Sequence, residues 1–234
     1  MKALISKGLG CLDYIRKSGM QDRWGGPFNG QQFRQRIFFD LLRHFAIKAI
    51  VETGTYRGTT TALFAETALP VYSVESHPRL YSFSRMRFRH QRSNIHLYNN
   101  DSRAFLAMIS NNATVPKEDV FFYLDAHWQD DLPLREELEV IFTNWTRPIV
   151  MIDDFQVPDS DYSFDDYGSG KTLNLDYLQP AIAAHNIAVF FPAVNAVEET
   201  GVKRGCVVLC PQETAMDIEK SISTLLRYPA DMDH

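Results

Sequence analysis

Three aspartates that follow short apolar segments are the strongest candidates for chemistry in this chain. Asp125 ends the segment 120–125, and Asp153 and Asp154 close the segment that begins at residue 148. Carboxylates brought together repel one another unless they are protonated or hold a cation. Oxygen ligands of this kind suit Mg²⁺. We therefore expect a divalent metal site here; the alternative is that Asp154 caps a turn and Asp153 faces water.

His127 stands two residues after the first of these aspartates and is the candidate general base. The unperturbed pKa of an imidazole suits proton removal near neutral pH. A histidine here could equally pack against a ligand or orient a carboxylate, and the residues alone leave both readings open. Trp128 follows it and could either flank a bound ligand or belong to the core.

A glycine turn follows an earlier apolar segment, 49–53, in the stretch ETGTYRGTT. Gly54 lets the backbone turn tightly, and Gly58 permits close approach where the next helix begins. The free N–H groups at the start of that helix would face a ligand. Tyr56 stands where the dinucleotide pattern needs its second glycine, which disfavours a nicotinamide or flavin cofactor. A purely structural turn is the alternative.

Polar residues also follow the next two apolar segments. Glu75, followed by Ser76, lies about twenty residues beyond the glycine turn, where a carboxylate holds ribose hydroxyls in sheets of this type. Its alternative role is a favourable interaction with a helix dipole. Asp101 and Ser102 could bind the amino edge of a purine, or Asp101 could simply cap the following helix.

The order of apolar segments and helical stretches predicts the elements that position these residues. Continuous apolar strands separated by helices are typical of an α/β fold, with a mostly parallel sheet covered on both faces. Ligands bind outside the carboxyl ends of such strands. We expect seven strands, the last two able to form an antiparallel edge, at 49–53, 71–75, 94–98, 120–125, 148–153, 187–191 and 206–209. We expect helices near 31–45, 58–67, 78–90, 101–112, 133–143, 174–185 and 213–226.

As a set, VETGTYRGTT, VYSVES and the pair Asp101 and Ser102 resemble the successive S-adenosylmethionine (SAM) motifs of class I methyltransferases. The resemblance covers residues 30–210 and implies a Rossmann-like, doubly wound sheet with SAM as cofactor. It places Glu52, Gly54 and Gly58 at the methionine end, Glu75 at the ribose, and Asp101 with Ser102 at the adenine. The complete implied cofactor set is Glu52, Gly54, Thr55, Tyr56, Gly58, Thr59, Glu75, Ser76, Asp101, Ser102, Asp125, His127 and Trp128.

The aspartates extend the resemblance to the metal-dependent O-methyltransferases, namely the catechol enzymes and the macrocin and novobiocin-type sugar enzymes. In those families an Asp after the fourth strand and an acidic or amide pair after the fifth hold a divalent metal. The matching positions here are Asp125, Asp153 and Asp154. The resemblance implies a Mg²⁺-assisted O-methyltransferase acting on a hydroxyl of a sugar or secondary metabolite, with Asp125 and His127 as catalytic residues.

The chain departs from both families beside its first aspartate. The catechol enzymes have a Lys base shortly after this Asp, and this chain has none there; the sugar enzymes tend to have an acid where it has His127. Alternative functions for the same fold are those of an aminopropyl transferase, a metal-dependent hydroxylase or a non-catalytic SAM-binding module.

Composition narrows the classes of partner. A formal net charge of −5 argues against a general nucleic-acid binder, which needs a surplus of basic residues. The apolar runs are too short for a membrane span and the start is a poor signal peptide. We therefore expect a cytoplasmic enzyme with a small-molecule acceptor and neither nucleic-acid nor membrane partners; a homo-oligomer is left open.

The chain has no linker that would divide it, so residues 1–234 are expected to form one domain. Residues 1–46 would be an extension in which the first thirty are irregular and a helix follows. The acidic, aromatic loop 157–171 would be a substrate lid with hinges at Gly168 and Gly170, because long loops in compact domains are usually functional or disordered.

Overall fold

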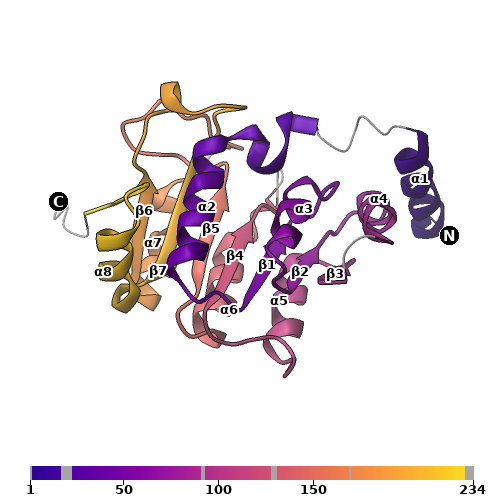
Figure 1. The fold of residues 1–234 in the computed structure, drawn as a ribbon, viewed down its shortest axis with the longest axis horizontal. Helices are drawn as coiled ribbons and strands as arrows, with labels where there is room; N and C mark the ends of the chain where they lie inside the picture. The colour runs from indigo at the N-terminus through magenta and orange to yellow at the C-terminus, as the bar shows by residue number, and fades with distance from the viewer. Residues whose placement is uncertain (1, 17–22, 91–92, 128–130, 169, 230–234) are drawn as a thin grey trace.

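The computed structural model describes residues 2–16, 23–90, 93–127, 131–168 and 170–229. Its centre is an eight-stranded sheet with the order β3-β2-β1-β4-β5-β7-β6-β8 (Figure 1). The strands are β1 (Ala49–Thr53), β2 (Val71–Val74), β3 (Ile95–Tyr98), β4 (Val120–Leu124), β5 (Ile149–Asp153), β6 (Ile187–Pro192), β7 (Cys206–Pro211) and β8 (Leu225–Arg227). The first five are parallel, β7 runs antiparallel to β5 and β6, and β8 runs antiparallel to β6.

Helices cover both faces of the sheet, as the apolar strands predict. They are α1 (Lys2–Arg16), α2 (Gln32–His44), α3 (Thr59–Glu66), α4 (Pro78–Phe88), α5 (Ser102–Ser110), α6 (Leu134–Asn144), α7 (Leu175–His185) and α8 (Gln212–Ser221). Short 3₁₀ turns lie at Arg23–Gly25, Pro27–Gly30 and Ala196–Glu198.

Alternate residues of each strand enter two separate cores. In β4, Phe121 and Tyr123 pack in the core formed with α2, α3 and α8, whereas Phe122 and Leu124 pack in the core formed with α5, α6 and α7. This alternation is the two-residue period of a strand. The mostly parallel, doubly wound architecture predicted from sequence is confirmed, with eight strands in place of seven.

Two predicted segments were wrong. Residues 2–16 are not irregular but form α1, in which the mid-helix glycines Gly8 and Gly10 obscure the pattern. The predicted helix 213–226 ends at Ser221, and the chain then forms β8, which pairs with β6 at Phe191↔Leu226. This last segment is a strand because it pairs with β6 in the folded protein, and the local sequence does not reveal that pairing.

The register of the parallel strands brings their carboxyl ends to one edge. Thr53 is the partner of both Val74 and Leu124, and Leu124 is the partner of Ile152. The residues that follow β1, β2, β4 and β5 therefore meet at this edge. Within the described ranges, no helix is long and apolar enough to cross a membrane.

Candidate functional site

The turn after β1 lies directly against the residues that follow β4. Gly54 has a φ of 91°, and a Cβ at this position would lie 2.1 Å from the carbonyl oxygen of Asp125. Only a glycine allows this approach. Gly58 also has a positive φ and precedes α3, which begins at Thr59. The predicted glycine turn is thus built between the first and fourth strands.

Glu52 is buried beneath this turn, where hydroxyl groups surround its carboxylate. Thr61 and Ser73 donate to Oε2 of Glu52, and Ser73 also bonds Thr55 at 2.6 Å. Burial raises the pKa of Glu52 to about 7, although both hydroxyl donors oppose the rise. The charged form is therefore costly here unless a cation or further donors approach it.

Glu75 joins the glycine turn to the segment after β2. Its carboxylate accepts hydrogen bonds from the backbone N–H of Tyr56 at 2.8 Å and of His77 at 2.7 Å. Burial raises the pKa of Glu75, and these backbone donors limit the rise. Asn99, after β3, donates to the carbonyl oxygens of Glu75 and Ser76. Three strand ends are thus tied together at the position predicted for a ribose.

Asp101 caps α5, as the alternative interpretation predicted. Its carboxylate accepts from the backbone N–H of Arg103 at 3.0 Å and pairs with the Arg103 guanidinium at 2.8 Å, which lowers the pKa of Asp101. Ser102 is buried and faces Glu137 of α6, a fully buried carboxyl whose pKa burial raises to about 7. A residue that caps a helix can also contact a ligand. The contact of Asp101 and Ser102 with a purine therefore stays a prediction.

Asp125, His127 and Asp154 form a compact cluster beside the glycine turn. Each offers one ligand atom, and these atoms lie within 4.8 Å of one another. Burial and the neighbouring aspartates raise the pKa of Asp125 well above its usual value and that of Asp154 to about 7. The buried His127 makes no hydrogen bond through either ring nitrogen within the described residues. The group is suited to hold a divalent cation.

Asp153, which the sequence placed in the metal set with Asp125 and Asp154, has both carboxylate oxygens engaged by other side chains. Its Oδ1 pairs with Arg34 of α2, and its Oδ2 accepts from Tyr123 and, at 3.2 Å, from Asn29. Asp153 continues the face of Met151, which packs in the α2 core, so its carboxylate meets Arg34 of that helix. The three residues whose ligand atoms gather are Asp125, His127 and Asp154, and a metal role for Asp153 stays a prediction.

Loop 157–171 is joined to the cluster by an ion-pair bridge. Arg204 donates to Oδ1 of Asp154 at 2.6 Å and also pairs with Asp165 of the loop. Asp165 lies 3.9 Å from Nε2 of His127. The position suits a lid, and its movement remains a prediction. Trp128, predicted to flank the cofactor, lies outside the described residues.

The sequence interpretation missed Arg34 and Arg204. Arg34 had a readable signal, because it precedes Ile37, Phe38 and Leu41 on the buried stripe of α2. A charged residue at such a position indicates a buried partner. Arg204 gives no comparable signal, since its partners are set by the register of β7 and the path of the loop.

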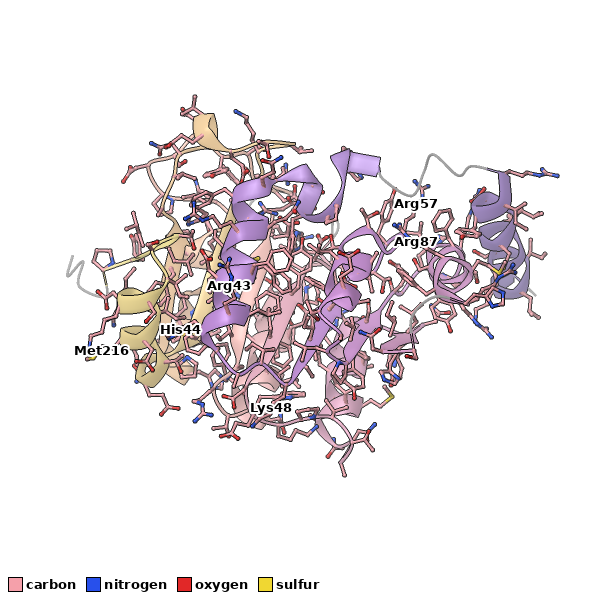
Figure 2. All side chains as sticks on the ribbon, in the orientation of Figure 1. Arg43, His44, Lys48, Arg57, Arg87 and Met216 are labelled. Atoms are coloured by element: carbon pink, nitrogen blue, oxygen red, sulfur yellow. The ribbon has the colours of Figure 1, made fainter. Side chains whose placement is uncertain are left out.

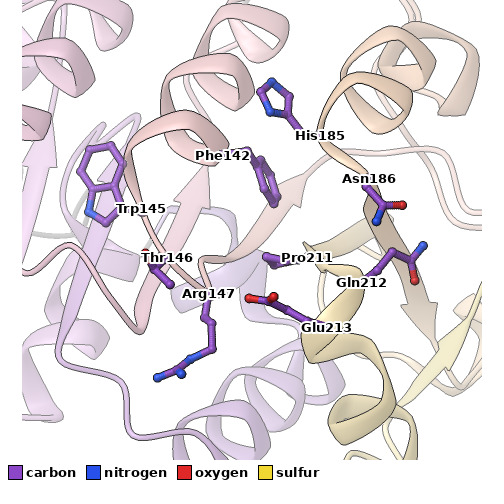
Figure 3. A pocket seen from close by; sticks show the side chains of 9 residues that line it. All are labelled: Phe142, Trp145, Thr146, Arg147, His185, Asn186, Pro211, Gln212 and Glu213. Atoms are coloured by element: carbon purple, nitrogen blue, oxygen red, sulfur yellow. The ribbon is translucent and has the colours of Figure 1, made fainter.

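The hollow drawn in Figure 3 is remote from these groups. It has a volume of about 340 Å³ and lies between the end of α6 and the start of α8, with Trp145 and Gln212 in its lining. Trp145 precedes β5, and Gln212 follows the antiparallel strand β7, so the hollow is at the amino-terminal edge of the parallel strands. The convergent acids are at the opposite edge.

Solved structures with a similar fold give the decisive comparison. An O-methyltransferase of Bacillus cereus in complex with SAH matches with a TM-score of 0.57 and 18% identity, over 76% of this chain and 81% of that chain. An O-methyltransferase of Streptomyces achromogenes involved in tomaymycin synthesis, in complex with SAM, matches with a TM-score of 0.55 and 15% identity, over 77% and 79%. This chain has the fold of SAM-dependent methyltransferases.

A third structure agrees with this fold assignment. SAM-bound CalS10, an amino pentose methyltransferase of Micromonospora echinaspora involved in calicheamicin biosynthesis, matches with a TM-score of 0.52 and 13% identity, over 79% and 94%. No family model matches the sequence, and no curated protein matches it. The resemblance to class I methyltransferases stated from the motifs is thus confirmed at the level of the fold.

Proposed function

We propose that this chain is a SAM-dependent O-methyltransferase that methylates a hydroxyl of a small molecule, a sugar or other secondary metabolite, with the help of a divalent metal ion. The observation that carries the proposal is the contact between the glycine turn and the cluster of Asp125, His127 and Asp154. Gly54 of the turn lies directly against the backbone of Asp125. A cofactor held by the turn would have its reactive end beside Asp125, His127 and Asp154.

The cofactor residues follow from the strand ends. Glu75 is already oriented by two backbone donors, so its free lone pairs can accept the ribose hydroxyls without further ordering. Glu52, buried beneath Gly54, supplies negative charge on the side where a sulfonium cation would lie. Ser102 with the capped end of α5 provides polar groups for the adenine edge.

The donor set of the cluster supports the proposed metal ion. Two carboxylates and one imidazole with unsatisfied ring nitrogens offer three ligands, leaving positions for water and an acceptor oxygen. Mg²⁺ suits the carboxylates, and the imidazole also suits Mn²⁺. An ion held there would lower the pKa of the acceptor hydroxyl and orient its oxygen.

The transfer is a displacement at the sulfonium methyl group. A bond forms between the methyl carbon and the acceptor oxygen, the carbon–sulfur bond breaks, and its electron pair stays on sulfur as S-adenosylhomocysteine. The hydroxyl proton passes to a cluster carboxylate or to His127, the predicted base. Alignment of the two reactants by the glycine turn and the cluster supplies the entropic part of the acceleration.

Product mass separates this function from its rivals. Purified enzyme incubated with SAM and a panel of hydroxylated sugars and polyketides should yield products heavier by one methyl group. Addition of an aminopropyl group or of one oxygen would identify the other chemistries. The hydroxylase reading is disfavoured because the cluster has one imidazole and two carboxylates, whereas non-haem iron oxygenases use two imidazoles and one carboxylate.

The role of His127 is tested by metal binding. Electron paramagnetic resonance of Mn²⁺ titrated into the protein should show weaker binding by His127→Gln and Asp154→Asn than by the wild type. Excess metal should then partly restore the activity of His127→Gln. Unchanged Mn²⁺ affinity with activity lost at every metal concentration would make His127 the base and remove it from the ligand set.

A further inference from the structure

Helix α1 lies outside the two layers that cover the sheet and packs against α4 (Figure 1). The contact is close, because a Cβ on Gly10 would lie 2.1 Å from the carbonyl oxygen of Arg79. Tyr14 meets Phe83 edge to face with ring centroids 5.4 Å apart, and Asp13 pairs with Arg79 at 2.6 Å. These contacts fix which side of α1 faces the protein and which faces outward.

The outward side of α1 is an exposed aliphatic stripe. Its members are between 42% and 76% exposed: Leu4, Ile5, Leu9, Leu12 and Ile15. At 100° per residue they fall on one half of the helix, opposite Gly10 and Tyr14. Scattered exposed apolar residues need no explanation, but a contiguous stripe along a whole helix marks an interaction surface.

The same end of the molecule is basic, although the protein is acidic overall. Lys7 and Arg16 lie on α1, and Arg79, Arg85 and Arg87 lie on α4. Arg85 and Arg89 are exposed. The acidic residue of the two helices is Asp13, which Arg79 neutralises. The whole chain carries a formal net charge of −5, so positive charge is segregated at this end.

We propose that α1 and the adjoining basic surface of α4 bind this protein to the surface of an anionic lipid bilayer. A helix with an aliphatic stripe and basic residues beside it lies in the interface, with its apolar side among the acyl chains and its cations near anionic headgroups. A second copy of this chain is a poorer occupant, because pairing two such ends would bring like charges together. The expected absence of a membrane partner rested on the lack of a spanning segment and does not address surface binding.

Vesicle co-sedimentation of the full chain tests the proposal. The protein should bind vesicles of phosphatidylcholine with one part in three of phosphatidylglycerol, should not bind phosphatidylcholine alone, and should dissociate at high salt. The double variant Leu4→Glu and Ile15→Glu should abolish binding. Its matched control, Val197→Glu and Met216→Glu, changes two similarly exposed residues by the same charge. Figure 2 shows Met216 at the opposite end of the molecule from α1.

Substitution of the exposed arginines is an independent test that leaves the aliphatic stripe of α1 unchanged. Arg85→Gln with Arg89→Gln should weaken partitioning on the order of tenfold at low salt. The proposal is overturned if the wild-type protein does not bind anionic vesicles, or if it binds neutral vesicles equally well. So does an equal loss in the Val197 and Met216 control. A dimer by light scattering that Leu4→Glu and Ile15→Glu dissociates, without vesicle binding, would assign the stripe to a second copy.

Discussion

Arg34 and Asp153 form a buried ion pair across 119 residues of sequence, joining α2 to the end of β5. The Arg34 guanidinium also donates to the carbonyl oxygens of Arg204 and Gly205, which precede β7. One side chain therefore fixes three segments around the candidate site. It also engages the carboxylate of Asp153, which is not in the group formed by Asp125, His127 and Asp154.

Breaking this pair should cost stability more than any surface change. Arg34→Met leaves Asp153 buried without its counter-ion, and such a loss costs about 3–5 kcal/mol. Urea unfolding measures the change. The control Arg36→Met removes an exposed arginine two residues away and should cost less than about 1 kcal/mol. Equal effects of the two variants would contradict the account of the pair.

Asp153→Asn should act on folding rather than on metal binding. The amide retains an acceptor for Tyr123 but leaves the Arg34 charge uncompensated in the core. We expect a lower urea midpoint with Mn²⁺ affinity close to that of the wild type. Asp154→Asn should show the opposite pattern. Loss of Mn²⁺ affinity in a stably folded Asp153→Asn protein would restore Asp153 to the ligand set.

Glu137 should make stability depend on pH. Burial raises its pKa to about 7 from 4.5, so the folded state holds a proton that the unfolded state releases. Its stabilising contribution is complete below pH 4.5 and is lost as pH rises through 7. The loss is on the order of 3 kcal/mol.

Unfolding free energies of the wild type and Glu137→Gln at several pH values isolate this effect. The variant should gain stability relative to the wild type as pH rises from about 5 towards about 8, since Gln carries no ionisable proton. Glu52, whose pKa is also raised to about 7, is present in both proteins and cancels. Parallel pH profiles would show that the Glu137 carboxyl is ionised at little cost.

Cofactor selectivity should depend on Glu75. S-adenosylhomocysteine, but not NAD, should raise the melting temperature, because a ligand bound only to the native state stabilises it by about 2.7 kcal/mol at a hundredfold excess over its Kd. Glu75→Gln should weaken the effect, and the exposed Glu136→Gln should not. Stabilisation by NAD alone, or a full response in Glu75→Gln, would refute the cofactor assignment.

The loop at 157–171 should open when its bridge to the cluster is removed. Arg204→Gln breaks the contacts with both Asp154 and Asp165, so backbone amides of the loop should exchange hydrogen faster. Lys203→Gln, one residue away, is the matched control. In the wild type, cofactor and acceptor together should slow the exchange. Identical exchange in every state would argue against a lid.

The sequence predicted those features that depend on local pattern. Strand ends with polar residues, the glycine turn and the capping role of Asp101 all follow from spacing and residue type. The direction of Asp153 was also within reach, because alternation from Met151 places it on the α2 side of the sheet. The three aspartates were grouped because they follow neighbouring strands; two of them, Asp125 and Asp154, lie in the cluster with His127, and a metal role for Asp153 stays a prediction.

Other features depend on contacts between distant segments and could not be read locally. Residues 225–227 form a strand because β6 offers them an unpaired edge. Residues 2–16 form a helix despite two internal glycines because this helix packs closely against α4. Arg204 reaches the site through the register of β7 and the path of the loop.

The most direct test of the central claim follows a labelled methyl group from SAM. Enzyme, SAM labelled in its methyl group and a cell extract freed of protein should give a labelled small molecule when Mg²⁺ or Mn²⁺ is present. EDTA should abolish the transfer, either metal should restore it, and Asp154→Asn should fail to respond. Label that stays on SAM under all these conditions would contradict methyl transfer, and full transfer in EDTA would remove the metal from the mechanism.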